Sequence, residues 1–422
     1  MPPLARATIP AAAAATGVLL AGALYVLGYR TLYHALLQYW GAFPFRFPFL
    51  DLHGVTAAIE CDRLGFDVYV QNPCDVFQRV HAYSPVWLWL GVLPITTAWD
   101  NALGIAVVLL FLATLPFLPP GRGGWQTAII TLGTVSGVVA YALERANIDL
   151  LIFVLATIAA VLTRRGGRWA TPGNAAALLA AMLKFYPVAL LILALRQRLA
   201  VFLAIGTVSF TVLAMWFVSD ANAILRSAAN IPTMDYRDDN VFAARDLPFG
   251  VAETLGLARP VAVLLFIALL VAMLGVAIAL ARYDDLRLRV RSLHEAEAVF
   301  LLIGCALMLV CFFAAQNGLY RAIHLLFVLP ALTVLVQSDG KRGPHLWSLG
   351  LVGLVLILMW HEPIRALAIT VAAWFGMSEP TAHFSAWLVL EIGWWIVVAA
   401  LAGLMLRLVW EARAFRDAIT LA

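Results

Sequence analysis

Asp51 and Lys184 have ionisable side chains and occur in apolar parts of the sequence. Desolvation there would change their acid–base properties most. Asp51 directly follows an apolar, proline-containing run at 43–50. Partial desolvation there would make its carboxylate a better general base, the group that takes a proton from an attacking hydroxyl. An alternative is structural: Asp51 is also well placed as the N-cap of a helix over 51–64, with Gly65 as its C-cap.

Lys184 is one of only two lysines among the 28 basic residues, and it lies in an apolar segment. A lysine within a membrane segment costs roughly 2.5–3.5 kcal/mol on insertion scales. An anion should therefore compensate it, and the phosphate of a lipid would do so. A structural ion pair, with Asp149 or Asp100 as the partner, is the alternative.

Arg321 and His324 are three residues apart at the start of a late apolar span. This spacing puts them on one helix face, and helix N-termini favour phosphate groups. We therefore expect Lys184, Arg321 and His324 to bind a phosphate. Snorkelling of Arg321 to the interface and a satisfied core position for His324 are the alternatives.

The composition defines the setting of these residues. Of the 422 residues, 63% are hydrophobic and 12% are charged, whereas soluble chains are about 45–50% apolar and about 25% charged. Soluble enzymes, coiled coils and disordered chains are thereby excluded. The net charge of +4 is spread thinly, which argues against binding of nucleic acid. We expect one integral membrane domain over 1–422.

Apolar stretches of about 20 residues predict membrane-spanning helices. The chain is expected to be an all-α polytopic membrane protein with about 10–12 such helices. The candidate spans are 10–30, 101–119, 126–143, 148–163, 199–218, 259–281, 298–315, 319–337, 346–360 and 385–409. The stretch 172–195 contains Lys184 and Pro187 and has arginines at both ends. It is either a pair of short helices that turn at Lys184 or a single kinked span.

Arginine-rich short loops stay in the cytoplasm, so the longer, acidic segments fall on the outer side. These segments are 31–97, 219–258 and 361–384, and the first contains interfacial helices. The spans themselves are nearly free of polar residues. The polar chemistry is therefore expected at the outer mouth of the protein. The second segment either binds an acceptor glycan or pairs with itself.

The remaining features restrict cofactors and crosslinks. Cys61 and Cys74 share the first outer segment, and they are either a disulfide or two free thiols. The histidines are too scattered for a zinc site, and no nucleotide-binding motif is present. We expect no metal and no cofactor.

The motifs together resemble a known family. The helix beginning at Asp51 is followed by Gly-x-Asp-x-Tyr (65–69) and Tyr-x-Pro (83–85), and later come Asn-Ile-Asp (147–149), Lys-Phe-Tyr-Pro (184–187) and Tyr-Arg-Ala-Ile-His (320–324). This order resembles the GT-C glycosyltransferases. More narrowly, it is similar to the bacterial polyprenol-phosphate-mannose-dependent mannosyltransferases, which include the phosphatidylinositol-mannoside mannosyltransferase.

The resemblance implies a GT-C-like fold and an inverting sugar transfer from a polyprenyl-phosphate donor to a hydroxyl of a glycolipid or glycan. Asp51 matches the position of the family's general base. The expected ligands of the sugar or acceptor are Asp67, Tyr69, Tyr83, Asn147, Asp149 and Tyr320. For Asn147, capping of a helix is the alternative. The expected location is the bacterial inner membrane, with the active site facing the periplasm.

Two other classes compete with this interpretation. A transporter or flippase of a lipid-linked substrate usually has paired broken helices in its two halves. The sequence indicates one broken segment, around 184–187. A membrane scaffold without catalysis would leave Lys184 and the carboxylates of the first outer segment without a role.

Overall fold

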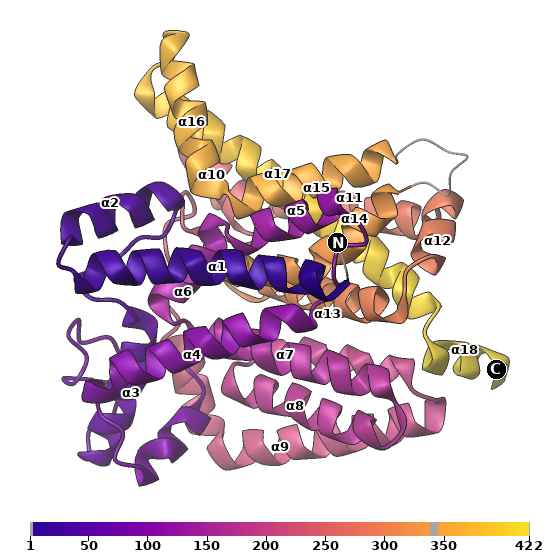
Figure 1. The fold of residues 1–422 in the computed structure, drawn as a ribbon, viewed down its shortest axis with the longest axis horizontal. Helices are drawn as coiled ribbons and strands as arrows, with labels where there is room; N and C mark the ends of the chain where they lie inside the picture. Colours follow the sequence, from indigo (N-terminus) through magenta and orange to yellow (C-terminus); the bar gives the residue numbers. More distant parts are fainter. Residues whose placement is uncertain (1–2, 338–344, 422) are drawn as a thin grey trace. The chain divides into compact units, whose positions relative to one another are not determined.

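The computed structural model describes residues 3–337 and 345–421. Helices dominate, and the described strands are two short segments that pair antiparallel, with Val241 opposite Gly318 and Phe242 opposite Asn317 (Figure 1). The all-α prediction is therefore confirmed.

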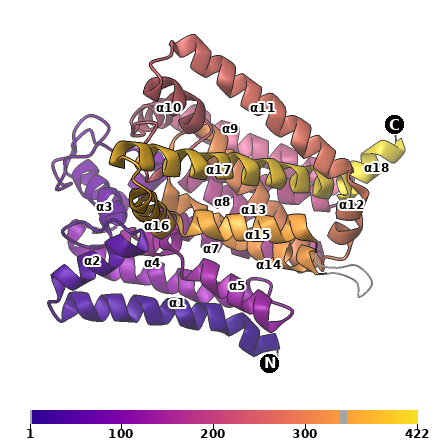
Figure 2. The same ribbon diagram turned by 90° about the horizontal axis from the view of Figure 1, so that it is seen from above.

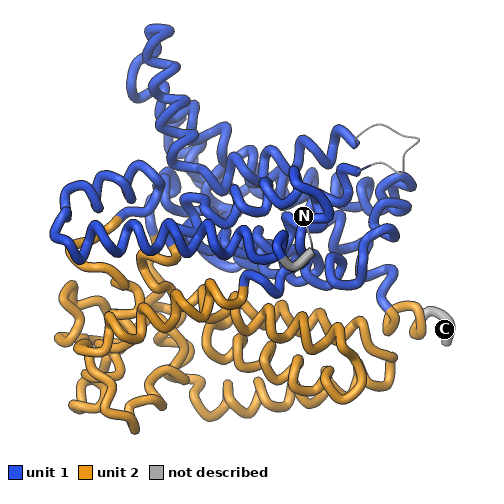
Figure 3. Tube along the Cα trace, viewed as in Figure 1, with its two compact units in different colours: residues 1–43, 115–141, 234–412 blue, residues 44–114, 142–233, 413–422 orange. Residues whose placement is uncertain are grey.

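The chain divides into two compact units, coloured separately in Figure 3. Unit 1 comprises residues 1–43, 115–141 and 234–412, and unit 2 comprises residues 44–114, 142–233 and 413–422. Helix α6 (Gly137–Arg145) passes from one unit to the other.

Unit 1 is a bundle of long apolar helices around α13 (Glu295–Ala314), α14 (Leu325–Val336) and α17 (Glu379–Trp410). Its other elements are α1 (Pro3–Val26), α2 (Arg30–Trp40), η3 (Leu115–Phe117), α5 (Gly124–Thr134), β1 (Val241–Phe242), α10 (Asp246–Thr254), α11 (Arg259–Arg282), α12 (Asp284–Arg291), β2 (Asn317–Gly318), η6 (Leu319–His324), α15 (Leu346–Met359) and α16 (His361–Trp374). Figure 2 shows α11, α15 and α17 running beside one another.

Unit 2 begins with residues 44–97 of the first predicted outer segment and continues into a bundle of helices. Its elements are α3 (Leu50–Arg63), η1 (Pro85–Val92), η2 (Thr97–Trp99), α4 (Asp100–Thr114), α7 (Ile148–Arg165), η4 (Gly167–Trp169), α8 (Ala170–Leu183), η5 (Tyr186–Arg196), α9 (Leu199–Ala229) and α18 (Arg413–Leu421). Helices α7 and α8 pack closely, and α8 also packs against η5. The chain therefore reverses at Lys184, which is the hairpin alternative for 172–195.

Within the described residues, seven helical segments are long and apolar enough to cross a membrane, or nine if each of two bent pairs is one span. This supports a multi-pass membrane protein. The predicted span at 148–163 corresponds to α7, which is not among these candidates because it carries Asp149, Arg164 and Arg165. The peripheral helices α1, α9 and α11 expose most of their apolar surface, as lipid-facing helices do.

The expected helices of the first outer segment are present. The amphipathic stretch forms α2, and Tyr83-Ser84-Pro85 leads into the short 3₁₀ helix η1. The Ser84 hydroxyl accepts a hydrogen bond from the Val86 N–H at 3.3 Å and so caps that helix. Cys61 and Cys74 form a disulfide, which ties the end of α3 to the loop that follows it.

Candidate functional site

Asp51 lies in the first turn of α3. The prediction that it is the N-cap is wrong: the helix begins at Leu50, and Phe49 is the N-cap residue. Phe49 has a positive φ of 67°, a left-handed conformation that a local sequence pattern does not predict for phenylalanine. Its N–H donates to the Glu144 carbonyl at 2.7 Å, which fixes the start of α3 against a distant segment of the same unit. The Asp51 side chain is therefore released from capping.

The Asp51 carboxylate is held from two sides. Asn147 Nδ2 donates to its Oδ2 at 2.5 Å, and Arg145 Nη1 lies 3.6 Å from its Oδ1. The Asp51 side chain is 14% exposed, so it is shielded but still reachable. A carboxylate in this state is a proton acceptor with a fixed direction.

Asn147 has the capping role that was the alternative for it, and it also contacts Asp51. Its Oδ1 accepts a hydrogen bond from the Asp149 N–H at 2.9 Å and caps α7, while its Nδ2 reaches Asp51. The side chain is fully buried. The cap of α7 therefore also orients the carboxylate of α3.

Lys184 forms an ion pair with Asp149, with Nζ and Oδ2 2.9 Å apart. Lys184 thus forms the structural ion pair that was the alternative to phosphate binding, and Asp149 is its partner. Tyr186 donates its hydroxyl to Asp149 Oδ1 at 2.7 Å, and Lys184 Nζ also donates to Asn147 Oδ1 at 3.4 Å. Asp100, the other possible partner, instead contacts His53 and Thr56.

Glu144 and Arg145 were missed by the sequence interpretation. Arg145 Nε lies 3.3 Å from Glu144 Oε2, and its guanidinium packs over the ring of Phe45 at 4.4 Å. A signal was present: Glu144, Arg145, Asn147 and Asp149 fall within six residues directly before an apolar helix. Ionisable residues inside a membrane segment are rare and are a signal of a functional site.

We call this group the Asp51 cluster, and all of it lies in unit 2. Its members are Asp51, Glu144, Arg145, Asn147, Asp149, Lys184 and Tyr186. It contains three carboxyl groups and two cations, and each cation lies beside at least one carboxyl group. The two cations are thus already paired, which makes a phosphate a less suitable ligand here than a hydroxyl.

The expected sugar ligands of the outer loop form two groups. Tyr83 belongs with the Asp51 cluster, because Lys184 Nζ lies 5.5 Å from its ring centre. Asp67 instead pairs with Arg226 of α9 at 2.6 Å, and the guanidinium of Arg226 packs over Tyr69. Burial is the main cause that raises the pKa of Tyr69 to about 12, so its phenol stays protonated at neutral pH.

The disulfide loop is held by a second ion pair. Arg79 Nη2 lies 2.7 Å from Asp75 Oδ2 and 3.0 Å from the Leu50 carbonyl. Burial acts to raise the pKa of Asp75, but the hydrogen bonds and charge of Arg79 outweigh it, and the net direction is down. Asp75 is thereby kept ionised, and the start of α3 gains a second support.

Tyr320, Arg321 and His324 belong to unit 1. They lie in the 3₁₀ helix η6, in which residues i and i+3 eclipse, so Arg321 and His324 point to one side. His324 is fully buried and stacks on Phe327, and Tyr320 packs edge-on against Tyr141. Within the described part of the chain, no group of three or more His, Cys, Asp or Glu side chains is arranged to hold a metal ion.

Comparison with known proteins adds no family to this description. No family model, no curated protein and no solved structure matches the chain.

Proposed function

We propose that the chain is a GT-C-type glycosyltransferase of the outer leaflet, with Asp51 as its general base. The donor is a sugar on a polyprenyl phosphate, and the acceptor is a hydroxyl of a glycolipid or glycan. The observation that carries the proposal is the Asp51 carboxylate itself. It is shielded, freed from capping, and oriented by Asn147 and Arg145 at the start of an outer-segment helix.

The reaction is a single displacement. Asp51 takes the proton of the acceptor hydroxyl, whose oxygen forms a bond to the anomeric carbon of the donor. The bond from that carbon to the phosphate oxygen breaks, and polyprenyl phosphate leaves with the bonding electrons. The transition state has oxocarbenium character, as in glycoside hydrolysis. Attack opposite the leaving group inverts the anomeric centre.

Lys184 has a different role in this mechanism from the one its sequence suggested. Its charge is offset by Asp149, so it is a positioning residue. It holds the Asn147 amide, which in turn holds Asp51. The binding of a phosphate by Arg321 and His324, which belong to unit 1, stays a prediction.

Tyr83 remains the group proposed to contact sugar or acceptor hydroxyls, because Asn147 and Asp149 are fully buried and already paired within the chain. Asp67 and Tyr69 are more simply explained by their contacts with Arg226. They are therefore proposed to shape the outer loop rather than to bind the sugar.

One observation favours a second candidate, a transporter or flippase of a lipid-linked substrate. Two helix pairs are bent, α5–α6 by 43° and α15–α16 by 90°. The sequence indicated one broken segment, whereas transporters characteristically have broken helices in both halves. The bent pairs fall in different halves of the chain.

A transfer assay separates the two candidates. Purified protein in lipid would receive a panel of polyprenyl-phosphate sugars and candidate acceptors, with release of polyprenyl phosphate as the readout. The glycosyltransferase proposal expects turnover with one donor. Movement of a lipid-linked sugar between the leaflets of vesicles, without release of polyprenyl phosphate, would replace it with the transporter.

A further inference from the structure

Unit 2 has a group of exposed arginines without ion-pair partners, which we call the arginine patch. Its members are Arg164, Arg165, Arg168, Arg198 and Arg413. Among the described residues, none of these five side chains forms an ion pair or donates a hydrogen bond. The guanidinium groups of Arg165 and Arg168 instead lie 5.7 and 5.2 Å from the ring centre of Trp169. The patch therefore carries five positive charges that are not paired within the described chain.

The fold brings these five arginines to one end of unit 2. The turn at 164–169 joins α7 to α8, and the two helices run side by side in Figure 1. Segment η5 packs back along α8, so the turn at 196–199, which leads into α9, lies at the same end. The Leu199 N–H donates to Asp417 Oδ2 at 3.2 Å and so holds α18, which begins at Arg413, beside this turn.

Acidic residues that are near in the sequence do not compensate the patch. The segment 150–219 contains no aspartate or glutamate. Asp417 of α18 already accepts the hydrogen bond from the Leu199 N–H. Five arginines of unit 1 differ, because each has a carboxylate partner. These pairs are Arg122 with Glu297, Arg287 with Asp284, Arg289 with Asp285, and Arg291 and Arg407 with Glu411. The lack of carboxylate partners is thus a property of this end of unit 2.

The positions of three of these arginines make the lack of a carboxylate more unfavourable. Arg198 is the N-cap residue of α9, Arg413 is the first residue of α18, and Arg168 lies two residues before the start of α8. The N-terminus of a helix carries a partial positive charge, which disfavours a cation and favours an anion. The dipole of α7 stabilises Arg164 and Arg165 in its last turn, but not the other three. An external anion would offset these charges.

The surroundings of the patch indicate that this anion belongs to a lipid. Trp169 is 39% exposed and lies close to Arg165 and Arg168, and tryptophan is enriched where membrane helices meet the headgroups. Exposed apolar side chains follow on the adjoining helices, such as Ile158 of α7 and Leu203 of α9. Cations next to apolar surface match a phosphate that is followed by acyl chains.

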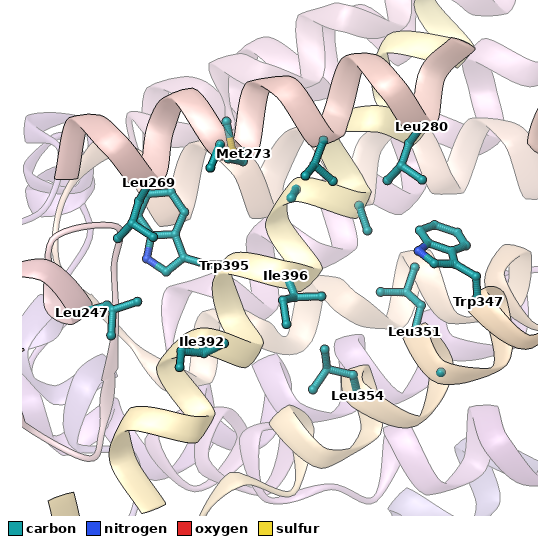
Figure 4. Close-up of a pocket in the computed structure, with 15 residues that line it drawn as sticks. Leu247, Leu269, Met273, Leu280, Trp347, Leu351, Leu354, Ile392, Trp395 and Ile396 are labelled. Atoms are coloured by element: carbon teal, nitrogen blue, oxygen red, sulfur yellow. The ribbon is translucent and has the colours of Figure 1, made fainter. Parts of the chain in front are cut away.

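An apolar groove of unit 1 is a contrasting surface. It lies between α11, α15 and α17, and none of its 15 lining residues is charged (Figure 4). Such a lining does not discriminate between headgroups, whereas the arginine patch presents five guanidinium groups to them. Selectivity for an anionic lipid is therefore expected at the patch.

We propose that the arginine patch and Trp169 bind anionic phospholipids of the leaflet that covers this end of unit 2. The guanidinium groups donate charge-assisted hydrogen bonds to the phosphate oxygens, and the acyl chains pack along the apolar faces of α7 and α9. Because short arginine-rich segments stay in the cytoplasm, we expect this leaflet to be the cytoplasmic one. The proposal is independent of the proposed sugar transfer.

Photo-crosslinking of the full chain in nanodiscs tests this binding. Two phospholipid probes would carry the same diazirine on an acyl chain and differ in the headgroup, which is phosphatidylglycerol or phosphatidylcholine. Each arginine near an anionic surface contributes about a factor of five to binding. We therefore expect the phosphatidylglycerol probe to label peptides of α7 and α9 at least about tenfold more strongly. Equal labelling by the two probes would overturn the proposal.

A charge-matched pair of variants assigns the preference to the patch. The test variant combines Arg164→Gln, Arg165→Gln and Arg168→Gln. The control variant makes the same change of charge at three exposed arginines outside the patch, Arg46, Arg237 and Arg259. We expect the test variant to lose most of the preference for phosphatidylglycerol and the control variant to keep it. Equal losses in both variants would show that net charge, rather than the patch, selects the lipid.

A second variant covers the case in which the test variant does not fold. Lysine at positions 164, 165 and 168 keeps the three charges, so this variant should keep most of the preference. Its loss in a folded lysine variant would contradict binding through charge. In the unaltered protein, the preference should decrease as the salt concentration rises, because ions screen exposed charges. A preference that does not change with salt would also contradict the proposal.

Inorganic phosphate distinguishes a lipid from a soluble anion. Labelling by the phosphatidylglycerol probe would be compared in phosphate and in chloride at the same ionic strength. We expect equal labelling in the two solutions, because the acyl chains hold the lipid at the patch. Loss of labelling in phosphate alone would show that the patch binds a soluble phosphate instead and would overturn the proposal.

Discussion

Both units contain buried acidic side chains, but the partners of these side chains differ between the units. In unit 2, Asp149 is paired with Lys184 and receives the hydroxyl of Tyr186, and Asp51 is held by Asn147 and Arg145. In unit 1, Asp246 has the neutral Gln316 as its partner, and Glu391 has an unpaired oxygen among the described residues. The negative charges of Asp51 and Asp149 are thus compensated by cations of the same unit, whereas Asp246 and Glu391 have no such cation among the described residues.

The difference teaches what each group is suited to do. A compensated carboxylate keeps its charge and its direction, which a general base needs. A buried carboxyl without a cation tends to hold a proton or to take a ligand that donates hydrogen bonds. The two groups are therefore expected to respond in opposite ways when their partners or the pH are changed.

The largest effect should come from removal of the cation in unit 2. Lys184→Met leaves Asp149 buried without its ion-pair partner, and loss of one member of a buried pair costs about 3–5 kcal/mol. The free energy of unfolding, measured by denaturation in detergent, should fall by that amount. The double variant with Asp149→Asn should recover most of the loss; no recovery would show that the two charges are not coupled.

In unit 1, the free energy of unfolding should depend on pH through Asp246. The folded protein holds this proton to about pH 7, whereas an unfolded carboxyl releases it near 3.8. The folded state therefore binds more protons between these values, and the free energy of unfolding falls as the pH rises from about 4 to 7. The full shift corresponds to about 4 kcal/mol.

Asp246→Asn should reduce this slope and stabilise the protein at pH 8, whereas Glu253→Gln at an exposed position of α10 should change neither. Thermal unfolding between pH 4 and pH 8 measures both effects. Asp75 of unit 2 has a lowered pKa and the opposite sign, so its contribution is present at neutral pH and is lost as the solution is acidified. A slope that is unchanged in Asp246→Asn would show that Asp246 does not cause it.

The disulfide between Cys61 and Cys74 should stabilise α3, the helix that carries Asp51. It links Cys61 at the end of α3 to Cys74, 13 residues later. Closure of a loop of about 15 residues contributes about 3 kcal/mol. Replacement of both cysteines by serine should lower the stability by up to that amount and expose residues 64–84 to proteases. The matched control is the pair of buried cysteines in α13, Cys305 and Cys311, replaced by alanine. A loop that stays resistant without the disulfide would place the support in Asp75 and Arg79 instead.

The smallest change in stability is expected at Asn147. Replacement by serine preserves an N-cap for α7 but is too short to hold Asp51, so the stability should fall by no more than about 1 kcal/mol. The kcat of transfer should fall by tenfold or more, while KM stays nearly constant, because the base loses its orientation. A proportional loss of stability and activity would make Asn147 a cap alone.

Much of the fold could be predicted, because membrane spans depend on local composition. Hydropathy predicts the apolar helices and the amphipathic helix α2. Together with the distribution of arginines, it also indicates the alternative of a hairpin at Lys184. The number of 10–12 spans stays a prediction, since the seven to nine candidates among the described residues are identified by length and composition only.

The candidate site was predicted less completely, because its contacts are long-range. The partnership of Asp51 with Asn147 joins residues 96 positions apart, and Phe49 adopts a left-handed conformation that no local pattern signals. Arg145 was overlooked beside the more conspicuous Asn147. The pair of Asp246 and Glu391 joins two segments that look unremarkable separately, and only the packing of α10 and α17 brings them together.

The central claim is tested most directly at Asp51. Asp51→Asn and Asp62→Asn lie on the same helix, α3, but Asp62 is exposed. After both variants are shown to fold, release of polyprenyl phosphate would be measured under single-turnover conditions with the active donor. We expect the rate to fall by a factor of about 10²–10⁴ in Asp51→Asn, which is the usual contribution of a general base. The rate of Asp62→Asn should be unchanged. A rate for Asp51→Asn within a factor of two of the unaltered protein would contradict the account.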